Sequence, residues 1–470
     1  MTIAQSPYLL QYADEHHPSM TTLVGGRDVR FDDSSLISNF GPVPSERRVD
    51  FLRIASAVHA VDRLVRRRSG PDGTLWGRHL WIRIGVSDLS FWTDPEVHEA
   101  LMEAIRFVTG DFWDIYFVRN PHPAPPAQRS LQSLRPEALD RQPVICLYSG
   151  GLDSAAGLGI RLAALQDRLF VPVSVIHHSH ERSRLRGQIW RLRQSAGGRL
   201  FPRSVEFSLP RPPGTGGSKR EWSQRARSFL FTVVGAVTAA LHDASSVEVY
   251  ESGVGLVNLP LMAGMIGSKA TRNCHPEFFR RMERLTSLVL ERDFHFDLPF
   301  ALATKGEMVQ RMKGLGLADL AIESVSCVHQ FGRKKDRRQC GVCAACLIRR
   351  LSLFVGGIDE RTGTYKVDLL SPGSDGVGKP PAMLLAMLGQ VVRLAAPDNE
   401  STRRRLQGHL YGTHILQLGE SMSPIVNLLC RYRAEWLMLA EECARRGAAW
   451  PRWLGMTPSS PGSEAIDAVA

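Results

Sequence analysis

Residues 147–157, LYSGGLDSAAG, bring together the residue types that can hold a phosphate group. Gly150 and Gly151 have no side chains, so their backbone N–H groups can approach phosphate oxygens closely. The hydroxyls of Ser149 and Ser154 can donate hydrogen bonds to the same oxygens. A helix that follows at once would point its positive end at the loop. This combination predicts an anion site with phosphate as the ligand.

Asp153 does not suit a bare phosphate, because its carboxylate would repel the anion. Its presence indicates either a phosphate bridged by a metal such as Mg²⁺ or a capping role at the start of the helix. A tight strand-to-helix turn without a ligand is the alternative. The loop contains neither GxxxxGK[ST] nor GxGxxG, so kinase-type γ-phosphate transfer and hydride transfer are not indicated.

Four cysteines follow the pattern C-x12-C-x2-C-x2-C: Cys327, Cys340, Cys343 and Cys346. Four thiolates suit tetrahedral Zn²⁺, and the C-x2-C spacing lets one turn present two sulfurs to one ion. An iron–sulfur cluster is the alternative ligand set, and free buried cysteines are a third reading. Four protein ligands leave no position for water, so a structural zinc site is predicted rather than a catalytic one. The scattered Cys146, Cys274, Cys430 and Cys443 are expected to be ordinary small core residues.

Alternating strands and helices are expected to position both motifs. Strands are predicted over 144–148, 169–178, 204–209, 245–253 and near 294–300, and helices over 154–164, 183–194, 221–243, 275–292 and from 305 onward. Such alternation predicts the α/β class, with a doubly wound parallel sheet. The loop SGGLDS then lies at the carboxyl end of the first strand, where these sheets bind ligands.

The rest of the chain predicts further domains. Residues 44–69 read as an amphipathic helix with Arg and Asp on its polar face, and strands at 79–86 and 113–118 flank a helix over 93–110. Residues 1–40 show little periodicity. The expected organisation is an α+β accessory domain over 1–128, a nucleotide-binding domain over 129–326, a zinc knuckle over 327–352, a helical extension over 353–456 and a disordered tail over 457–470.

The composition leaves the partner open. The 470 residues include 58 lysines and arginines against 47 aspartates and glutamates, for a formal net charge of +11. This excess is either a solvated basic surface or the mark of an anionic partner, and the run 333–338 allows the same two readings. No uninterrupted apolar stretch reaches about 18 residues, and the first residues do not read as a signal peptide. A cytoplasmic protein without membrane contact is predicted.

The motif SGGLDS resembles the PP-loop of N-type ATP pyrophosphatases, which cleave ATP to AMP and pyrophosphate while adenylating an oxygen of a substrate. A PP-loop followed by such a cysteine knuckle is similar to the 7-cyano-7-deazaguanine synthase (QueC) family. TKGEM (304–308) resembles the family's T-K-A-E-I, and CGVCAAC matches C-G-x-C-x-x-C, with Arg349 after it. ARSFLF resembles a segment that holds an arginine, here Arg227, and HPEFF resembles R-P-E-F with His275 in place of arginine.

The resemblance covers about 143–352 and implies a doubly wound sheet that binds ATP, with a structural zinc on the four cysteines. It implies that the ATP phosphates and Mg²⁺ are bound by Ser149, Gly150, Gly151, Leu152, Asp153 and Ser154. It further implies that Lys305 and Arg227 neutralise charge developing on pyrophosphate, so that the catalytic set is Ser149, Asp153, Arg227 and Lys305. The implied substrate is a 7-deazaguanine carboxylate, adenylated and then attacked by an amine.

Three departures from the simple enzymes are visible. IHHSHERS (176–183) replaces a segment resembling D-Y-G-Q-R-H, and His177, His178 and His180 are expected to make local contacts, with a catalytic base as the alternative. The segment 251–278 is longer and more apolar. The added terminal regions resemble the larger QueC-like proteins of bacterial anti-phage operons, such as the QatC components of Qat systems, some of which are thought to acylate the N-terminal amine of a partner protein.

The resulting prediction is an ATP-dependent enzyme of anti-phage defence that transfers a deazaguanine carboxylate to an amine, carried by an operon-encoded partner protein. One alternative is a synthase that uses ammonia and forms the nitrile. A second is a tRNA-modifying or sulfur-transfer enzyme, for which Cys274 is the plausible free thiol. A third is a scaffold without catalysis. Nucleic acid is a less favoured partner.

Overall fold

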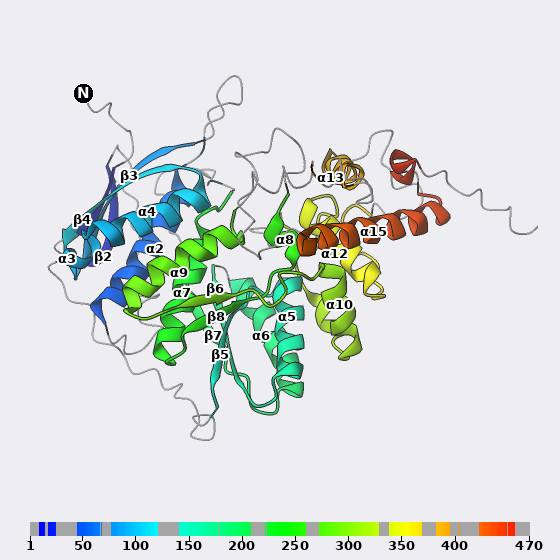
Figure 1. Cartoon of the computed structure of the whole chain (residues 1–470), viewed down its shortest axis with the longest axis horizontal. Helices are drawn as coiled ribbons and strands as arrows, with labels where there is room; N and C mark the ends of the chain where they lie inside the picture. The colour runs from blue at the N-terminus through cyan, green and yellow to red at the C-terminus, as the bar shows by residue number, and fades with distance from the viewer. Residues whose placement is uncertain are drawn as a thin grey trace, which may run out of the picture. The chain divides into compact units, whose positions relative to one another are not determined.

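The structure of the chain is a computed structural model (Figure 1). It describes residues 9–14, 17–24, 45–65, 67, 77–120, 141–177, 179–207, 221, 223–259, 272–328, 338–368, 382–394, 404, 423–448 and 450–455. Contacts divide the chain into two compact units. Unit one is Met1–Ser149, Leu165–Val249 and Gly267–Pro299, and unit two is Gly150–Ala164, Tyr250–Ile266 and Phe300–Ala470.

A five-stranded parallel sheet lies in unit one. Its strands are β5 (Pro143–Leu147), β6 (Leu169–Ile176), β7 (Arg203–Glu206), β8 (Ser246–Val249) and β9 (His295–Asp297), in the order β7-β6-β5-β8-β9. All four pairings are parallel. Every residue of β6 is buried, as expected for a strand inside a parallel sheet covered on both faces. The predicted α/β class and parallel sheet are therefore confirmed, and each strand begins and ends within a few residues of its predicted position.

A second sheet, of four strands, precedes it in unit one. It contains β1 (Leu9–Asp14), β2 (His17–Val24), β3 (His79–Val86) and β4 (Phe112–Arg119), in the order β2-β1-β3-β4. Between β3 and β4 lie α3 (Leu89–Trp92) and α4 (Pro95–Thr109). Asp94 caps α4, Pro95 occupies its first turn, and Gly110 ends it at a φ of 67°, as the sequence predicts. The strands β1 and β2 fall in the region where the sequence shows little periodicity.

Helix α2 (Glu46–Leu64) differs from its prediction. The sequence predicts a solvated polar face, but every residue from Val49 to Asp62 is buried. The buried carboxylates are compensated by hydrogen bonds. Asp50 accepts from the backbone N–H groups of Ser87 at 2.9 Å and of Asp88 at 3.1 Å. A helix with charges on one face can therefore be a core helix when each charge meets a partner.

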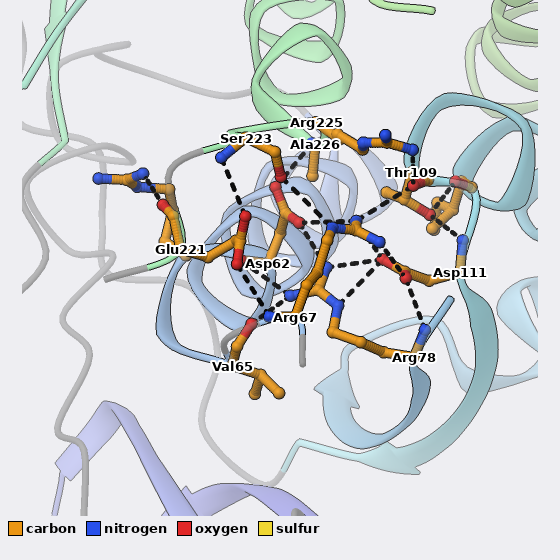
Figure 2. Close-up of polar contacts among 12 residues, drawn as sticks. Asp62, Val65, Arg67, Arg78, Thr109, Asp111, Glu221, Ser223, Arg225 and Ala226 are labelled. Atoms are coloured by element: carbon orange, nitrogen blue, oxygen red, sulfur yellow. Dashed lines mark hydrogen bonds and ion pairs between the residues drawn. The ribbon is translucent and has the colours of Figure 1, made fainter. Parts of the chain in front are cut away.

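Four charged side chains form a buried group at the end of α2, which we call the core ion cluster: Asp62, Arg67, Arg78 and Asp111 (Figure 2). The guanidinium of Arg67 donates to both oxygens of Asp111 at 2.6 and 2.7 Å. Nη2 of Arg78 lies 2.6 Å from both Asp62 Oδ1 and Asp111 Oδ2. Both aspartate side chains are 0% exposed. Two charges of each sign are thus balanced inside unit one.

Helix α7 (Arg227–Leu241) begins later than predicted, because the segment before it serves the core ion cluster. The sequence predicts a helix from 221. Instead, the backbone N–H of Ala226 donates to Asp62 at 2.9 Å, and Glu221 accepts from the N–H of Arg67 at 2.8 Å (Figure 2). Gln224 has a φ of 45°, outside the helical range. Unit one also contains α6 (Ser179–Ser195) and α9 (Pro276–Leu290), and the His275 side chain caps α9.

Unit two is helical in its described parts. It contains α5 (Leu152–Ala164), α8 (Gly253–Val257), α10 (Lys305–Gly314), α11 (Ala318–Glu323), α12 (Ala344–Val355), α13 (Ala382–Arg393), α15 (Ser423–Arg445) and the 3₁₀ helix η4 (Trp450–Leu454). Apolar residues of α12, α13, α15 and η4, such as Leu351, Met387, Trp436 and Trp450, share one core. The predicted helical character of the C-terminal region is confirmed for α13 and α15.

Several predictions concern residues outside the described ranges. These are the predicted disordered tail 457–470 and, within the predicted helical extension 353–456, the segments 369–381, 395–403 and 405–422. Within the described residues, no helix combines the length and hydropathy that crossing a bilayer requires.

Candidate functional site

The turn between β5 and α5 has the local conformation that its glycines allow. Gly150 has a φ of 70°, a left-handed value that strains any residue with a side chain. The carbonyl of Gly151 accepts hydrogen bonds from the N–H of Ala155 and the hydroxyl of Ser154, each at 3.0 Å. Ser154 therefore closes the first turn of α5, and its contact with a phosphate stays a prediction.

Two of the predicted site residues meet in unit two. Lys305 Nζ lies 2.6 Å from Asp153 Oδ2, and the two side chains are 16% and 14% exposed. Each residue stands in the first turn of its helix, Asp153 in α5 and Lys305 in α10, and these helices pack together. Burial lowers the pKa of Lys305, but the carboxylates of Asp153 and Glu251 outweigh it, and the pKa is raised overall. The side chain of Lys305 is therefore protonated and positively charged at neutral pH.

The second oxygen of Asp153 has an incomplete environment. Oδ1 is buried and has no hydrogen-bond partner among the residues that the structure describes. A buried carboxylate oxygen without a donor is costly, so such an atom calls for a bound cation or donor. Carboxylate oxygen is the ligand type that Mg²⁺ prefers. Asp153 therefore fits a metal-bridged phosphate better than a capping role.

Ser149 and Arg227 belong to unit one. The carbonyl of Ser149 accepts from Arg184 Nη2 at 3.4 Å. The guanidinium of Arg227 stacks on the ring of Phe231 at 4.8 Å. Burial lowers the pKa of Arg227, with Arg184 acting in the same direction and Glu181 against it. Arg184 was not singled out from the sequence, because it is one of several arginines in α6 with no distinguishing spacing.

His59 in unit one is also affected by positive charges, including that of Arg227. Burial, Arg63 and Arg227 lower the pKa of His59 to about 3, so this side chain is neutral. His177 makes the local contacts expected for it, since its Nδ1 lies 3.0 Å from the carbonyl of Phe207. His178 and the side chain of His180 lie outside the described residues.

The four predicted zinc ligands converge. The sulfurs of Cys327, Cys340, Cys343 and Cys346 all lie within 4.8 Å of one another. The sulfurs of Cys340 and Cys346 are 3.8 Å apart, the edge of about 3.8 Å that a tetrahedron with Zn–S bonds of about 2.3 Å requires. Backbone N–H groups of Cys340 and Cys343 donate to sulfur at 3.3 Å. These residues fit a zinc ion held by four thiolates.

Neighbouring residues hold the cysteine loops in place. Gly341 has a φ of 80°, and a Cβ added there would lie 1.9 Å from the carbonyl oxygen of Val367, which explains the glycine of C-G-x-C. Arg349 donates to Glu360 at 2.6 Å and to the carbonyls of Ala321 and Ile322 at 3.1 and 2.8 Å. Arg349 is thus fully engaged as a structural residue. Of the basic run 333–338, only Arg338 lies within the described residues.

A cavity of about 110 Å³ in unit two reaches Lys305. Its other polar lining residues include Ser252, Gln390, Tyr432 and Glu435, with an apolar wall that includes Leu351 and Leu429. Burial raises the pKa of Glu435 to about 7 and that of Tyr432 to about 12. Gln390, Tyr432 and Glu435 come from α13 and α15 and were missed from the sequence, where they read as ordinary polar positions of amphipathic helices.

A larger cavity, of about 770 Å³, lies in unit one between α6 and β7. It is lined by Arg182, Arg186, Arg193, Arg203 and Trp190 among others, and by none of the predicted site residues. Volume alone would favour this groove. We place the candidate site at the smaller cavity because Lys305, which is paired with Asp153, forms part of its wall.

Comparison with known proteins gives a partial likeness. Residues 265–355 match the profile of the family described as "Queuosine biosynthesis protein QueC". Over 115 residues the chain is 25% identical to the 7-cyano-7-deazaguanine synthase of Thermoplasma acidophilum, across 24% of this chain and 45% of that protein. The chain thus spans about half the length of this curated relative. The segment 265–355 is QueC-like and contains Lys305 and the four cysteines, whereas SGGLDS lies outside it.

Proposed function

We propose that the chain is an ATP-dependent enzyme of the QueC type, with a PP-loop in a doubly wound sheet. It adenylates the carboxylate of a 7-deazaguanine and transfers the acyl group to an amine. The observation that carries this proposal is the Asp153–Lys305 pair, with its buried and unpartnered carboxylate oxygen. The QueC-like segment around Lys305 supports the choice of substrate class.

The chemistry explains why an activation step is needed. A carboxylate is a poor acyl donor, so its oxygen first attacks the α-phosphorus of ATP and displaces pyrophosphate. The amine nitrogen then attacks the carbonyl carbon, AMP departs with the bonding electron pair, and the nitrogen loses a proton. Negative charge grows on the departing pyrophosphate during the first step. A partly buried, positively charged lysine such as Lys305 stabilises that charge.

Two metal ions complete the proposal. Asp153 is the residue that would hold Mg²⁺, which supplies charge neutralisation to the phosphates. The four cysteines would hold Zn²⁺, which supplies only structural stability because no ligand position is open. We expect about one zinc per purified chain by elemental analysis, and loss of that zinc with a lower Tm in Cys346→Ser. Iron in place of zinc would identify an iron–sulfur cluster instead.

The acceptor is the least constrained part of the proposal. We favour an amine on an operon-encoded partner protein in anti-phage defence, because the chain carries long regions on both sides of its QueC-like segment. Ammonia, with dehydration to the nitrile, is the second candidate, supported by the printed activity of the Thermoplasma relative. Sulfur transfer to tRNA has weaker support: the thiol of Cys146 is buried in β5, and Cys274 is half-buried.

The deciding experiment separates these acceptors. The chain is incubated with ATP, Mg²⁺ and 7-carboxy-7-deazaguanine, and pyrophosphate release is followed. The purified operon-encoded partner or ammonia is then added, and intact mass spectrometry is run on the partner and on the small molecules. A mass gain on the partner supports protein acylation, and nitrile formed from ammonia supports the synthase. Pyrophosphate release that never depends on the deazaguanine would contradict the proposal.

A further inference from the structure

Helix α15, in the C-terminal region, contacts the residues on both sides of Lys305. The hydroxyl of Thr304 donates to Glu435 Oε1 in the buried interior of unit two. One turn earlier on α15, Arg431 Nε lies 2.6 Å from Glu307 Oε1, and Arg431 Nη2 donates to the carbonyl of Leu302 at 2.7 Å. Helix α15 therefore holds both the chain entering α10 and the first turn of α10.

Thr304 is the N-cap of α10, and Lys305 is the next residue. Its hydroxyl accepts from the N–H of Glu307 at 3.0 Å, and its own N–H donates to Glu307 Oε2 at 2.9 Å. This is a complete capping box. Because the hydroxyl oxygen already accepts a hydrogen bond from Glu307, its proton is directed to Glu435. Besides its two hydrogen bonds with Glu307, Thr304 therefore has a third one with Glu435, which lies outside α10.

Gly306 permits this close approach of α15. A Cβ added at Gly306 would lie 2.6 Å from Glu435 Oε1 and 2.6 Å from Val355 Cγ1. Any larger residue would push Glu435 and its helix away from the N-cap. Thr304 therefore caps α10 and Lys305 supplies the cation. Gly306 leaves the room that Glu435 occupies.

We propose that Glu435 is a positioning residue for Lys305, acting through the Thr304 cap, so that the C-terminal region is part of the activation machinery. Lys305 must lie within hydrogen-bond reach of Asp153 and of the departing pyrophosphate, and a displacement of about 1 Å can cost about a hundredfold in rate. Glu435 touches none of the reacting groups in this scheme. The inference rests on the proposed ATP chemistry and assigns a role to a helix that lies outside the QueC-like segment.

The charges around Glu435 give the inference a pH signature. The charged groups on the α10 side are Glu307 and Lys305, which lines the same cavity, and the ionisable groups on α15, the helix of Glu435 itself, are Arg431 and Tyr432. The lining residues that α8, α12 and α13 add to the shared cavity carry no ionisable group. Burial raises the pKa of Glu435 to about 7, with Glu307 acting in the same direction and Thr304 and Arg431 against it. The strength of the hydrogen bond that Glu435 accepts from the Thr304 hydroxyl therefore changes near neutral pH.

The test compares Glu435→Ala, Glu435→Gln and, as a control on the same helix, Glu442→Gln, whose carboxylate pairs with the exposed Arg445 and Arg446. Pyrophosphate release is measured from pH 6 to 9, at a temperature where all variants are folded. We expect Glu435→Ala to lower kcat at least about tenfold with KM for ATP changed less than about threefold. Glu435→Gln keeps an accepting oxygen, so it retains most of kcat but loses the inflection near pH 7. Glu442→Gln matches wild type.

A second readout does not depend on turnover. Competitive labelling with acetic anhydride, followed by peptide mass spectrometry, measures the reactivity of Lys305. Loosening of the cap in Glu435→Ala is expected to raise labelling of Lys305 at least about twofold, with Lys313 as the internal reference. If Glu435→Ala has the kcat of wild type and unchanged labelling of Lys305, the inference about Glu435 is overturned, whereas the proposed function is not affected. A wild-type protein that releases no pyrophosphate would overturn the proposed function, and the labelling result would still decide whether Glu435 positions Lys305.

Discussion

The core ion cluster of unit one and the Asp153–Lys305 pair of unit two both bring opposite charges together, but the cluster is buried and the pair is only partly buried. In the cluster, both oxygens of Asp62 and of Asp111 accept hydrogen bonds, and both aspartate side chains are fully buried (Figure 2). In the pair, one oxygen of Asp153 has no hydrogen-bond partner within the described part of the chain, and both side chains keep some exposure. A cluster in which every carboxylate oxygen has a hydrogen-bond partner is best explained by a role in stability. A carboxylate oxygen that lacks a partner marks a place where a ligand can bind.

The largest expected effect is on the structural side of this comparison. Asp111→Ala leaves Arg67 and Arg78 buried with one carboxylate between them. Removing one partner of a buried ionic group costs about 3–5 kcal/mol, so we expect a loss of this size in the free energy of unfolding. Denaturant titration checks it. A loss below about 1 kcal/mol would show that the cluster relaxes toward solvent and is not a closed structural unit.

The matching change in unit two is the double variant Asp153→Asn/Lys305→Met, which removes both charges together. Because the double change removes one charge of each sign, we expect the free energy of unfolding to change by less than about 1 kcal/mol or to rise. Pyrophosphate release is expected to fall about 10²- to 10³-fold, as when one transition-state donor is lost. A variant that loses stability but keeps its rate would make the pair structural and erase the contrast with the core ion cluster.

A third prediction concerns Glu435, the acid beside the cap of α10. Its pKa is raised from 4.5 to about 7, so the folded chain holds this proton more tightly than the unfolded chain. The stability it contributes is therefore fully present below pH 4.5 and is lost as the pH rises through about 7. Glu435→Gln has no such charge to bury, so at pH 8 it should exceed wild type by about 1–3 kcal/mol. Unfolding curves at pH 5 and 8 test this, and an equal difference at both values would contradict the raised pKa.

The smallest expected effect is at the turn that precedes Asp153. Gly150→Ala places a side chain at a φ of 70° and should cost about 1 kcal/mol of stability. Gly187 of α6 has a negative φ and no atom within 4 Å of an added Cβ, so Gly187→Ala is the matched control and should be neutral or slightly stabilising. Equal effects of the two variants on unfolding would mean that the turn at Gly150 is not strained.

The sequence predicts what depends on local patterns. The parallel strands follow from short apolar runs, and the turn at Gly150 follows from glycines between a strand and a helix. The convergence of Cys327 with Cys340, Cys343 and Cys346 is predictable because their C-x12-C-x2-C-x2-C spacing is typical of a four-thiolate metal site. The closeness of Asp153 and Lys305 was implied by resemblance, since no local pattern links residues so far apart in the chain.

The sequence does not predict what depends on packing between distant segments. Asp62 and Arg67 read as the polar face of an amphipathic helix, but their partners come from the residue before β3, from the turn before β4 and from the segment before α7. That segment reads as helix because its partner, Asp62, is unknown until the fold is known. Glu435 likewise reads as one more polar residue of α15 and becomes distinctive only through its contact with Thr304.

The central claim is that the Asp153–Lys305 pair serves ATP-dependent activation of a deazaguanine carboxylate. The most direct measurement is exchange of labelled pyrophosphate into ATP in the presence of Mg²⁺ and 7-carboxy-7-deazaguanine, in wild type and in Asp153→Asn/Lys305→Met. The account predicts exchange that requires the carboxylate in wild type and falls at least about 10²-fold in the double variant while its Tm is retained. Absence of carboxylate-dependent exchange in wild type, or equal exchange in the two proteins, would contradict it.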